Sequence, residues 1–198
     1  MNHPSIDIIR SEHLSIAAVA HGLLHFSRAI RERQPLPDFR VFRAMLYYLD
    51  VFVERFHHPK EDRYLFAKIS LRTDESAEVL ARLQNDHARG EQSIRDLMQA
   101  VIRLEFGHET YADEFVTRVE AYAAFHSRHM GLEQDIVLPL AQRALTQADW
   151  QEIDAAFLGN VDPLIGVDEK KGFDALFTKI ITITPPPIGV GPEIAPGA

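Results

Sequence analysis

Residues 42–65 read FRAMLYYLDVFVERFHHPKEDRYL, and this stretch decides the fold. Apolar side chains recur along it every three or four residues, which is the period of an amphipathic α-helix. The same stripe carries two polar residues, since it runs Phe42, Leu46, Leu49, Val53, His57, Glu61 and Leu65. A glutamate on the buried face of a helix is costly without partners, so the stretch predicts a long helix with a polar layer in its core face.

Three further stripes have the same period. They comprise Ile6, Ile9, His13, Ile16, Ala20 and Leu23; Leu80, Leu83, His87, Gly90, Ile94, Leu97 and Val101; and Phe115, Val119, Tyr122, His126, His129, Glu133, Ile136 and Leu140. Turn-forming residues separate the stripes near residues 34–38, 73–74 and 106–108, and Asp38 has the character of an N-cap. Short connections make successive helices antiparallel neighbours. The sequence therefore predicts an all-α, up-down-up-down antiparallel four-helix bundle over residues 1–145.

The rest of the chain differs in composition. Residues 146–149 resemble a capping box that opens a helix to about residue 157, and another helix is expected over residues 168–181. We assign residues 146–183 to a C-terminal helical extension of the same domain. Residues 184–198 form a Pro/Gly-rich tail, expected as an extended arm that packs on the bundle or on a second subunit. A homodimer is therefore left open.

Composition excludes several classes of protein. The 198 residues include 21 Lys+Arg against 29 Asp+Glu, a formal net charge of −8, and no basic run, which argues against nucleic acid as the main partner. No apolar run reaches the length of a membrane helix and no signal-peptide pattern is present, so we expect a cytoplasmic protein with no membrane partner. The absence of cysteine excludes thiolate zinc sites and iron–sulfur clusters. The ten histidines are about twice the ordinary usage and need an explanation.

Two segments repeat one pattern of histidine and glutamate. His57 and Glu61 are four residues apart, as are His129 and Glu133, so each pair lies on one face of a helix. Each pair follows another histidine, by 44 and 42 residues, and an acid precedes that earlier histidine: Glu12-His13 and Asp86-His87. The bundle has the pattern of a duplicated helical hairpin.

The spacing also places these side chains at one height. In an antiparallel hairpin, residues equidistant from the turn lie level with each other. The midpoint of His13 and His57 is residue 35, that of Glu61 and His87 is residue 74, and that of His87 and His129 is residue 108, each in a predicted turn. Four histidines and two glutamates therefore converge on one layer. Imidazoles suit iron, zinc or copper and carboxylates can bridge two ions, so this layer predicts a metal site.

The ordered set of motifs resembles the hemerythrin-like HHE cation-binding family. The resemblance covers about residues 5–145, and rests on His13, on His57 to Glu61 followed by Leu65-Phe66, on His87, and on His129 to Glu133 before Leu138-Pro139. It implies a non-haem di-iron centre in which Glu61 and Glu133 are bridging carboxylates. His13 and His57 would be terminal ligands of one iron, and His87 and His129 those of the other. Zinc or manganese could substitute for iron.

Several residues depart from the family pattern or stand beside it. Oxygen-carrying hemerythrins have a fifth histidine one turn after the first on the third helix, where this chain has Glu91. Glu91 is either an additional ligand or a solvated flank, and both interpretations stay open. His126 is expected to hydrogen-bond a ligand or water, in the second shell of the site. His58 is expected to be exposed or to contact a helix, and Pro59 to kink the second helix at the metal layer.

The sequence favours a binding protein over an enzyme. We expect a di-iron module that binds or senses O2 or a related small ligand such as NO, or that handles iron. The alternative is a di-iron oxidase, a peroxidase or a nitric oxide-handling enzyme. An enzyme needs an acid or base beyond the metal ligands, and His126 is the one candidate that the stripes offer.

Overall fold

The computed structural model describes residues 3–159 and 169–194. Within these residues all regular secondary structure is helical, as the stripes predict. The order of the elements is α1 (Pro4–Arg31), α2 (Phe39–Tyr48), η1 (Leu49–His57), α3 (His58–Lys60), η2 (Glu61–Phe66), α4 (Ala67–Arg72), α5 (Ala77–Gly107), η3 (His108–Tyr111), α6 (Ala112–Leu132), η4 (Glu133–Val137), α7 (Leu138–Ala144), α8 (Gln147–Leu158) and α9 (Glu169–Ile183).

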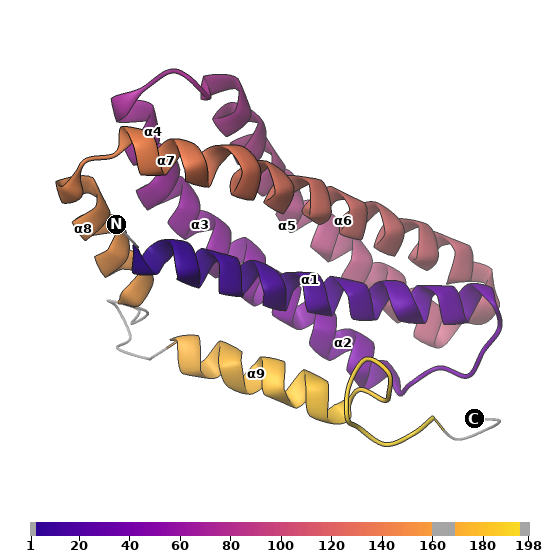
Figure 1. Ribbon diagram of the computed structural model, residues 1–198. Helices are drawn as coiled ribbons and strands as arrows, with labels where there is room; N and C mark the ends of the chain where they lie inside the picture. The colour runs from indigo at the N-terminus through magenta and orange to yellow at the C-terminus, as the bar shows by residue number, and fades with distance from the viewer. Residues whose placement is uncertain (1–2, 160–168, 195–198) are drawn as a thin grey trace.

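These elements make four long helical stretches: α1, α2 to α4, α5, and α6 to α7. The short turn η3 joins the third stretch to the fourth. Figure 1 shows α1 lying alongside α6, with α5 and the α2–α4 stretch behind them. The predicted N-cap at Asp38 is confirmed, since its carboxylate accepts a hydrogen bond from the backbone N–H of Arg40 at 2.7 Å. The turn at residues 34–38 thus starts the second stretch as expected.

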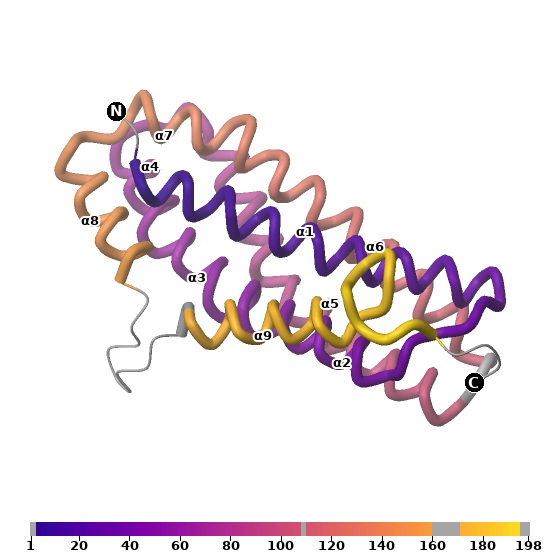
Figure 2. The backbone as a smooth tube through the Cα atoms, turned by 60° about the horizontal axis from the view of Figure 1, so that its bottom comes forward, coloured from indigo at the N-terminus to yellow at the C-terminus, as the bar shows by residue number. Residues whose placement is uncertain are grey.

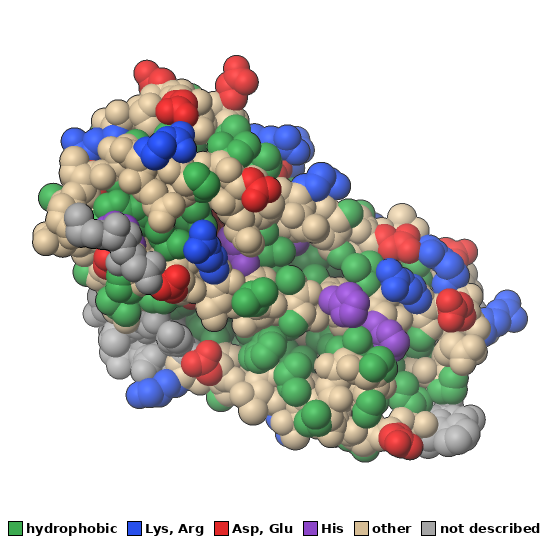
Figure 3. Space-filling model, viewed as in Figure 1, with side chains coloured by type: hydrophobic (Ala, Val, Ile, Leu, Met, Phe, Trp, Pro, Cys, Tyr) green, Lys and Arg blue, Asp and Glu red, His purple; other side chains and the backbone are tan. Residues whose placement is uncertain are grey.

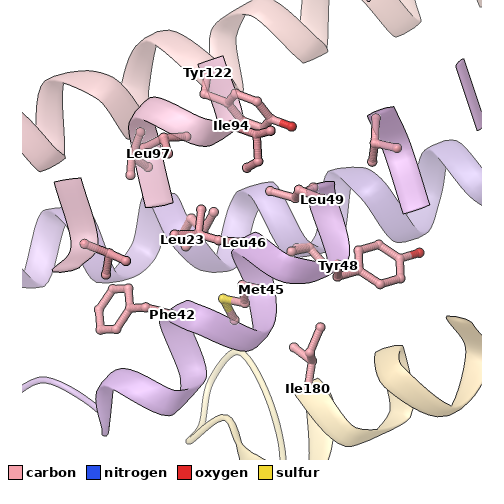
Figure 4. Close-up of a cluster of buried hydrophobic side chains, with 14 of the residues drawn as sticks. Leu23, Phe42, Met45, Leu46, Tyr48, Leu49, Ile94, Leu97, Tyr122 and Ile180 are labelled. Atoms are coloured by element: carbon pink, nitrogen blue, oxygen red, sulfur yellow. The ribbon is translucent and has the colours of Figure 1, made fainter. Parts of the chain in front are cut away.

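The apolar stripes bury into two separate clusters. One contains Leu23, Leu46 and Ile94 among its members, and Figure 4 shows how these side chains meet between the helices. The other, nearer the N-terminus of α1, contains Ile9, Leu83 and other residues from the opposite half of each stretch. Along every stretch the polar residues of the stripe fall between the two clusters. The core is therefore divided by a polar layer.

The C-terminal extension packs against both core clusters. The predicted capping box is present: the Thr146 side chain accepts from the backbone N–H of Asp149, and Asp149 accepts from that of Thr146. Helix α8 packs on the second cluster, while α9 lies along α2, as Figures 1 and 2 both show. Residues 160–168, which connect the two helices, lie outside the described residues.

The tail differs from the extended arm that its prolines predicted. The backbone N–H of Val190 donates to the carbonyl of Ile181, and that of Gly191 donates to the carbonyl of Thr184, so the chain turns back on the end of α9. A Cβ atom at Gly189 would collide with the Thr184 carbonyl, which explains why glycine is needed in so close a turn. The prediction of an extended arm is wrong for these residues, because the glycines let the backbone pair with itself.

The surface carries both signs of charge. On the face in Figure 3, acidic and basic side chains are interspersed rather than segregated. None of the described helices combines the length and the apolar character needed to cross a membrane.

The hydrogen bonds between α4 and α8 hold the C-terminal extension on the bundle, and their contribution to stability can be tested. Arg72 donates two hydrogen bonds to Asp149, at 2.8 and 2.9 Å, and these bonds hold the pKa of the Asp149 carboxyl below its usual range. We expect Asp149→Ala to lower the free energy of unfolding by about 1–2 kcal/mol, since it removes both the Asp149 half of the capping box and the link to Arg72. Urea unfolding followed by Trp150 fluorescence measures this change.

The matched control is Glu152→Ala, because Glu152 is an exposed acid on the same helix that pairs with Lys68. Its effect should stay within about 0.5 kcal/mol. The Asp149 contribution should be complete above about pH 5 and decline as the pH falls below the ordinary carboxyl range, because the folded-state pKa is lowered. Equal effects of the two substitutions would contradict this account.

Candidate metal centre

The six residues expected on one layer are brought together. Their ligand atoms form two neighbouring groups, one of His13, His57 and Glu61, the other of Glu61, His87, His129 and Glu133, with the atoms of each group within 4.8 Å of one another. Every member is buried. The four helical stretches each contribute at least one residue, so the centre exists only in the assembled bundle.

Glu61 lies between the two pairs of histidines. Its Oε1 atom is 3.4 Å from Nε2 of His57 and 3.7 Å from Nε2 of His13, whereas its Oε2 atom is 3.8 Å from Nε2 of His87. The two oxygens of one carboxylate therefore face different pairs. This is the arrangement that a bridging carboxylate requires.

Glu133 lies between the same pairs from the other side. Its Oε2 atom is 3.3 Å from Nε2 of His13, and its Oε1 atom is 3.2 Å from Nε2 of His129 and 3.9 Å from that of His87. In addition, the Nε2 atoms of His87 and His129 are only 3.0 Å apart. The nitrogens of each pair thus converge between the two carboxylates.

The carboxylates lack hydrogen-bond partners. Glu61 is 0% exposed and Glu133 is 1% exposed, yet none of their four oxygens has a hydrogen-bond partner among the described residues. A buried carboxylate without partners is strongly unfavourable, and buried charges in proteins are paired or coordinate metals. The donor set of imidazole nitrogens and carboxylate oxygens therefore fits metal cations held between Glu61 and Glu133.

The electrostatics point the same way. Burial alone would raise the pKa of Glu133, but the neighbouring His129 and His13 outweigh it and hold that pKa well below its ordinary value. Burial would lower the pKa of His13, but Glu133 and Glu61 raise it to about 10. The layer therefore keeps the Glu133 carboxylate negative and favours positive charge beside it, which a bound cation supplies.

A second ring of polar residues backs the four histidines, and the sequence stripes did not predict it. The Nδ1 atom of His57 hydrogen-bonds Glu12 at 2.7 Å, and that of His13 hydrogen-bonds the Gln134 amide at 3.1 Å. At ion-pair distance, Nδ1 of His87 is 3.0 Å from Asp62 and Nδ1 of His129 is 3.6 Å from Asp86.

Such partners orient metal-binding imidazoles, and the three carboxylates among them also raise imidazole basicity. The sequence contained a pattern that could have predicted these partners. Each partner is the immediate sequence neighbour of one ligand candidate and contacts a different candidate on another stretch.

Widened helical turns surround the candidate ligands. Stretches η1, η2 and η4 are π-helical, and their i→i+5 bonds include His58 N–H to the carbonyl of Val53 and Leu138 N–H to that of Glu133. Single π turns inside α-helices are frequent at functional sites. Pro59, expected to kink the helix, lies in the three-residue α3 turn between two of them. Its missing N–H and its ring disfavour regular α-helical bonding there, which accounts for the wider turns nearby.

The structure decides between the interpretations left open for Glu91 and His58. Glu91 is the solvated flank: it is exposed and bonds Arg95 at 3.1 Å, because the buried stripe of α5 passes through Gly90 instead. His58 contacts a helix and is not exposed, since its ring stacks on that of His87 in α5 with centroids 4.0 Å apart. The α2–α4 stretch has neighbours on two sides, so a residue 100° from His57 still points into the bundle.

His126 lies next to the layer without touching the ligand candidates through a hydrogen bond. It is buried, and both of its ring nitrogens lack a hydrogen-bond partner among the described residues. Its Nε2 atom is 3.5 Å from a carboxylate oxygen of Glu54, a buried acid that the sequence did not single out. The expected hydrogen bond from His126 to a ligand or water therefore stays a prediction.

The fold and the two donor groups define a class, a helical protein whose core fits metal cations. A family model for the hemerythrin HHE cation-binding domain matches residues 5–141. The chain therefore belongs to this family, as its motifs indicated. No curated protein and no solved structure matches the chain.

Metal binding should stabilise the fold. A free Zn²⁺ concentration 100 times the dissociation constant should raise the free energy of unfolding by about 2.7 kcal/mol for each site that binds only the folded state. Adding a chelator should reverse the gain. Thermal unfolding with and without Zn²⁺ measures both effects.

Two variants make this test specific. Glu61→Gln should remove most of the Zn²⁺-dependent gain, because Glu61 belongs to both donor groups. Glu91→Gln should keep the gain in full, because Glu91 faces solvent. A gain that survives Glu61→Gln would show that Zn²⁺ binds elsewhere.

Proposed function

We propose that this protein holds two iron ions between Glu61 and Glu133 and uses them to bind or sense O2 or a related small ligand such as NO, or to handle iron. The observation that carries the proposal is the set of four buried, unpartnered carboxylate oxygens, each facing one or two imidazole nitrogens at 3.2–3.9 Å. Membership of a cation-binding family supports it.

The residues have distinct roles in this proposal. His13 and His57 would hold one ion, and His87 and His129 the other, with the two glutamates shared between them. Glu12 and Gln134 orient the first pair of imidazoles, while Asp62 and Asp86 orient the second pair. When bound, such a metal pair supplies reversible redox chemistry and open positions for a small ligand.

The ligand count favours sensing or iron handling over oxygen transport. Four imidazoles and two carboxylates give less nitrogen donation than the five histidines of oxygen-carrying relatives, and Glu91 does not add a ligand. A more anionic donor set stabilises the higher charge of oxidised metal. The proposal therefore includes ready oxidation of the reduced protein by O2.

The proposal also includes the architecture around the centre. The course of the chain in Figures 1 and 2 supports an up-down-up-down order of the four long stretches. Residues 1–145 would form the metal-binding bundle, 146–183 its helical extension and 184–198 a tail. Zinc or manganese would occupy the same positions as substitutes.

Reconstitution with Fe²⁺ without oxygen, followed by elemental analysis, tests the metal content. We expect two irons per chain, about one in the double variant His13→Ala/His57→Ala, and two in the control Glu91→Gln. About 0.2 or fewer transition-metal ions per chain after reconstitution would contradict the proposal, since six converging ligands should bind tightly.

Exposure of the reduced, iron-loaded protein to air tests its use. We expect visible charge-transfer bands that appear on oxidation, shift with azide and do not reverse when oxygen is removed. Slow oxidation with fully reversible oxygenation would instead show an oxygen carrier.

A further inference from the structure

The ring of residues behind the four histidines is not symmetric in charge. The two HxxxE segments align so that Asp62 and Gln134 occupy equivalent places, each directly after a glutamate of the metal layer. Asp62 backs His87 with a carboxylate, whereas Gln134 backs His13 with a neutral amide. His57 and His129 are both backed by acids, Glu12 and Asp86. The first pair of histidines therefore has one anionic partner and the second pair has two.

A third acid lies on the side of the second pair. Glu54 is 4% exposed, and its Oε2 atom is 3.0 Å from Nδ1 of His58. The ring of His58 lies 4.0 Å from that of His87 and 5.1 Å from that of His129, measured between centroids, but 5.7 Å from that of His57. Glu54 is thus linked to the second pair through one stacked imidazole.

The surroundings of Glu54 stabilise its negative charge without cancelling it. Tyr122 donates a hydrogen bond to Oε1 at 3.2 Å, and His126 lies 3.5 Å from the same oxygen. Burial alone would raise the pKa of Glu54, but His126 and His58 bring it down to about 2. Among the described residues, the hydrogen-bond and ion-pair partners of Glu54 are His58, His126 and Tyr122, with no lysine or arginine. The carboxylate therefore places negative charge inside the bundle without a permanent cation beside it.

Gly90 shows that the fold makes room for this acid. A Cβ atom at Gly90 would collide with the Glu54 carboxylate, so α5 accommodates the acid only with glycine there. Gly90 is on the buried stripe, three residues after His87. The carboxylate of Glu54, from the neighbouring stretch, takes up the space beside it.

We propose that the two metal positions are unequal, and that the position formed by His87 and His129 binds its cation first and more tightly because Glu54, Asp62 and Asp86 surround it with negative charge. This inference rests on the proposed function, since it concerns the same two positions. It assigns to Glu54 a role in setting the cation affinity of this position, although Glu54 is not one of the six candidate ligands.

Titration of the metal-free full chain with Co²⁺, followed by visible absorption and calorimetry, tests the inequality. We expect two binding steps whose dissociation constants differ by about tenfold or more. The double variant His87→Ala/His129→Ala should lose the tighter step, and His13→Ala/His57→Ala should lose the weaker one. Two indistinguishable steps, or the reverse assignment, would overturn the inference.

Single substitutions then test the cause. Glu54→Gln should weaken the tighter step by about tenfold and leave the weaker one unchanged, while Gln134→Glu should tighten only the weaker step. Glu54→Asp keeps the charge and should retain most of the affinity. Asp50→Asn is the matched control, because Asp50 is a buried acid on the same π-helical stretch whose charge is already paired with Arg55 at 2.9 Å. It should change neither step.

The outcomes separate this inference from the proposed function. A wild-type chain that binds no Co²⁺ would count against both. A wild-type chain that binds two ions while Glu54→Gln behaves like Asp50→Asn would overturn the inference alone. Circular dichroism of each metal-free variant confirms that it is folded, and Glu54→Asp supplies a second comparison if Glu54→Gln is not.

Discussion

The rest of the structure depends on one constraint: two carboxyl groups are held in the middle of a helical bundle with no hydrogen bonds of their own. Taking a carboxylate out of water costs several kcal/mol even after the protein relaxes. Glu61 and Glu133 are nevertheless almost fully buried, and opposite them stand four imidazoles, not arginines or lysines. An imidazole can give a lone pair to a metal ion, which arginine and lysine cannot, so cations between the two kinds of donor would satisfy both.

The polar neighbours of the histidines follow a circular order around the bundle. Glu12 on the first stretch serves His57 on the second, and Asp62 on the second serves His87 on the third. Asp86 on the third serves His129 on the fourth, and Gln134 on the fourth returns to His13 on the first. No stretch orients its own histidine in this way. The geometry of each ligand is therefore set by the packing of a neighbouring helix, which ties the precision of the site to the tertiary fold.

The sequence predicted the helical class and the six converging residues because both follow from the period of the apolar stripes and from distances to the turns. A stripe with a period of 3.6 fixes which residues face inward, and distances from the turns fix their height. The partners of the histidines were missed because they lie at the edge of the stripe and act across helices. Glu54 was missed for a related reason, since its burial depends on a glycine one helix away.

What the sequence left open or missed has local causes as well. Glu91 would be a ligand only if α5 turned its i+4 position inward after His87, but the buried stripe continues at i+3. The tail was expected to be extended from its prolines, whereas two glycines among them permit a closed turn. Composition predicted neither outcome, because each depends on a specific contact.

The division of the apolar core has a consequence for how the molecule unfolds. The two clusters lie on opposite sides of the polar layer. One is covered by α8, which the Arg72–Asp149 link holds in place, and the other by α9 with its closed tail. Without ions, the layer between them contains buried polar atoms that lack hydrogen-bond partners, so we expect one half to open while the other stays packed. Ions coordinated by all four stretches would join the halves into a single cooperative unit. Metal occupancy would then determine whether the bundle unfolds as one unit or as two.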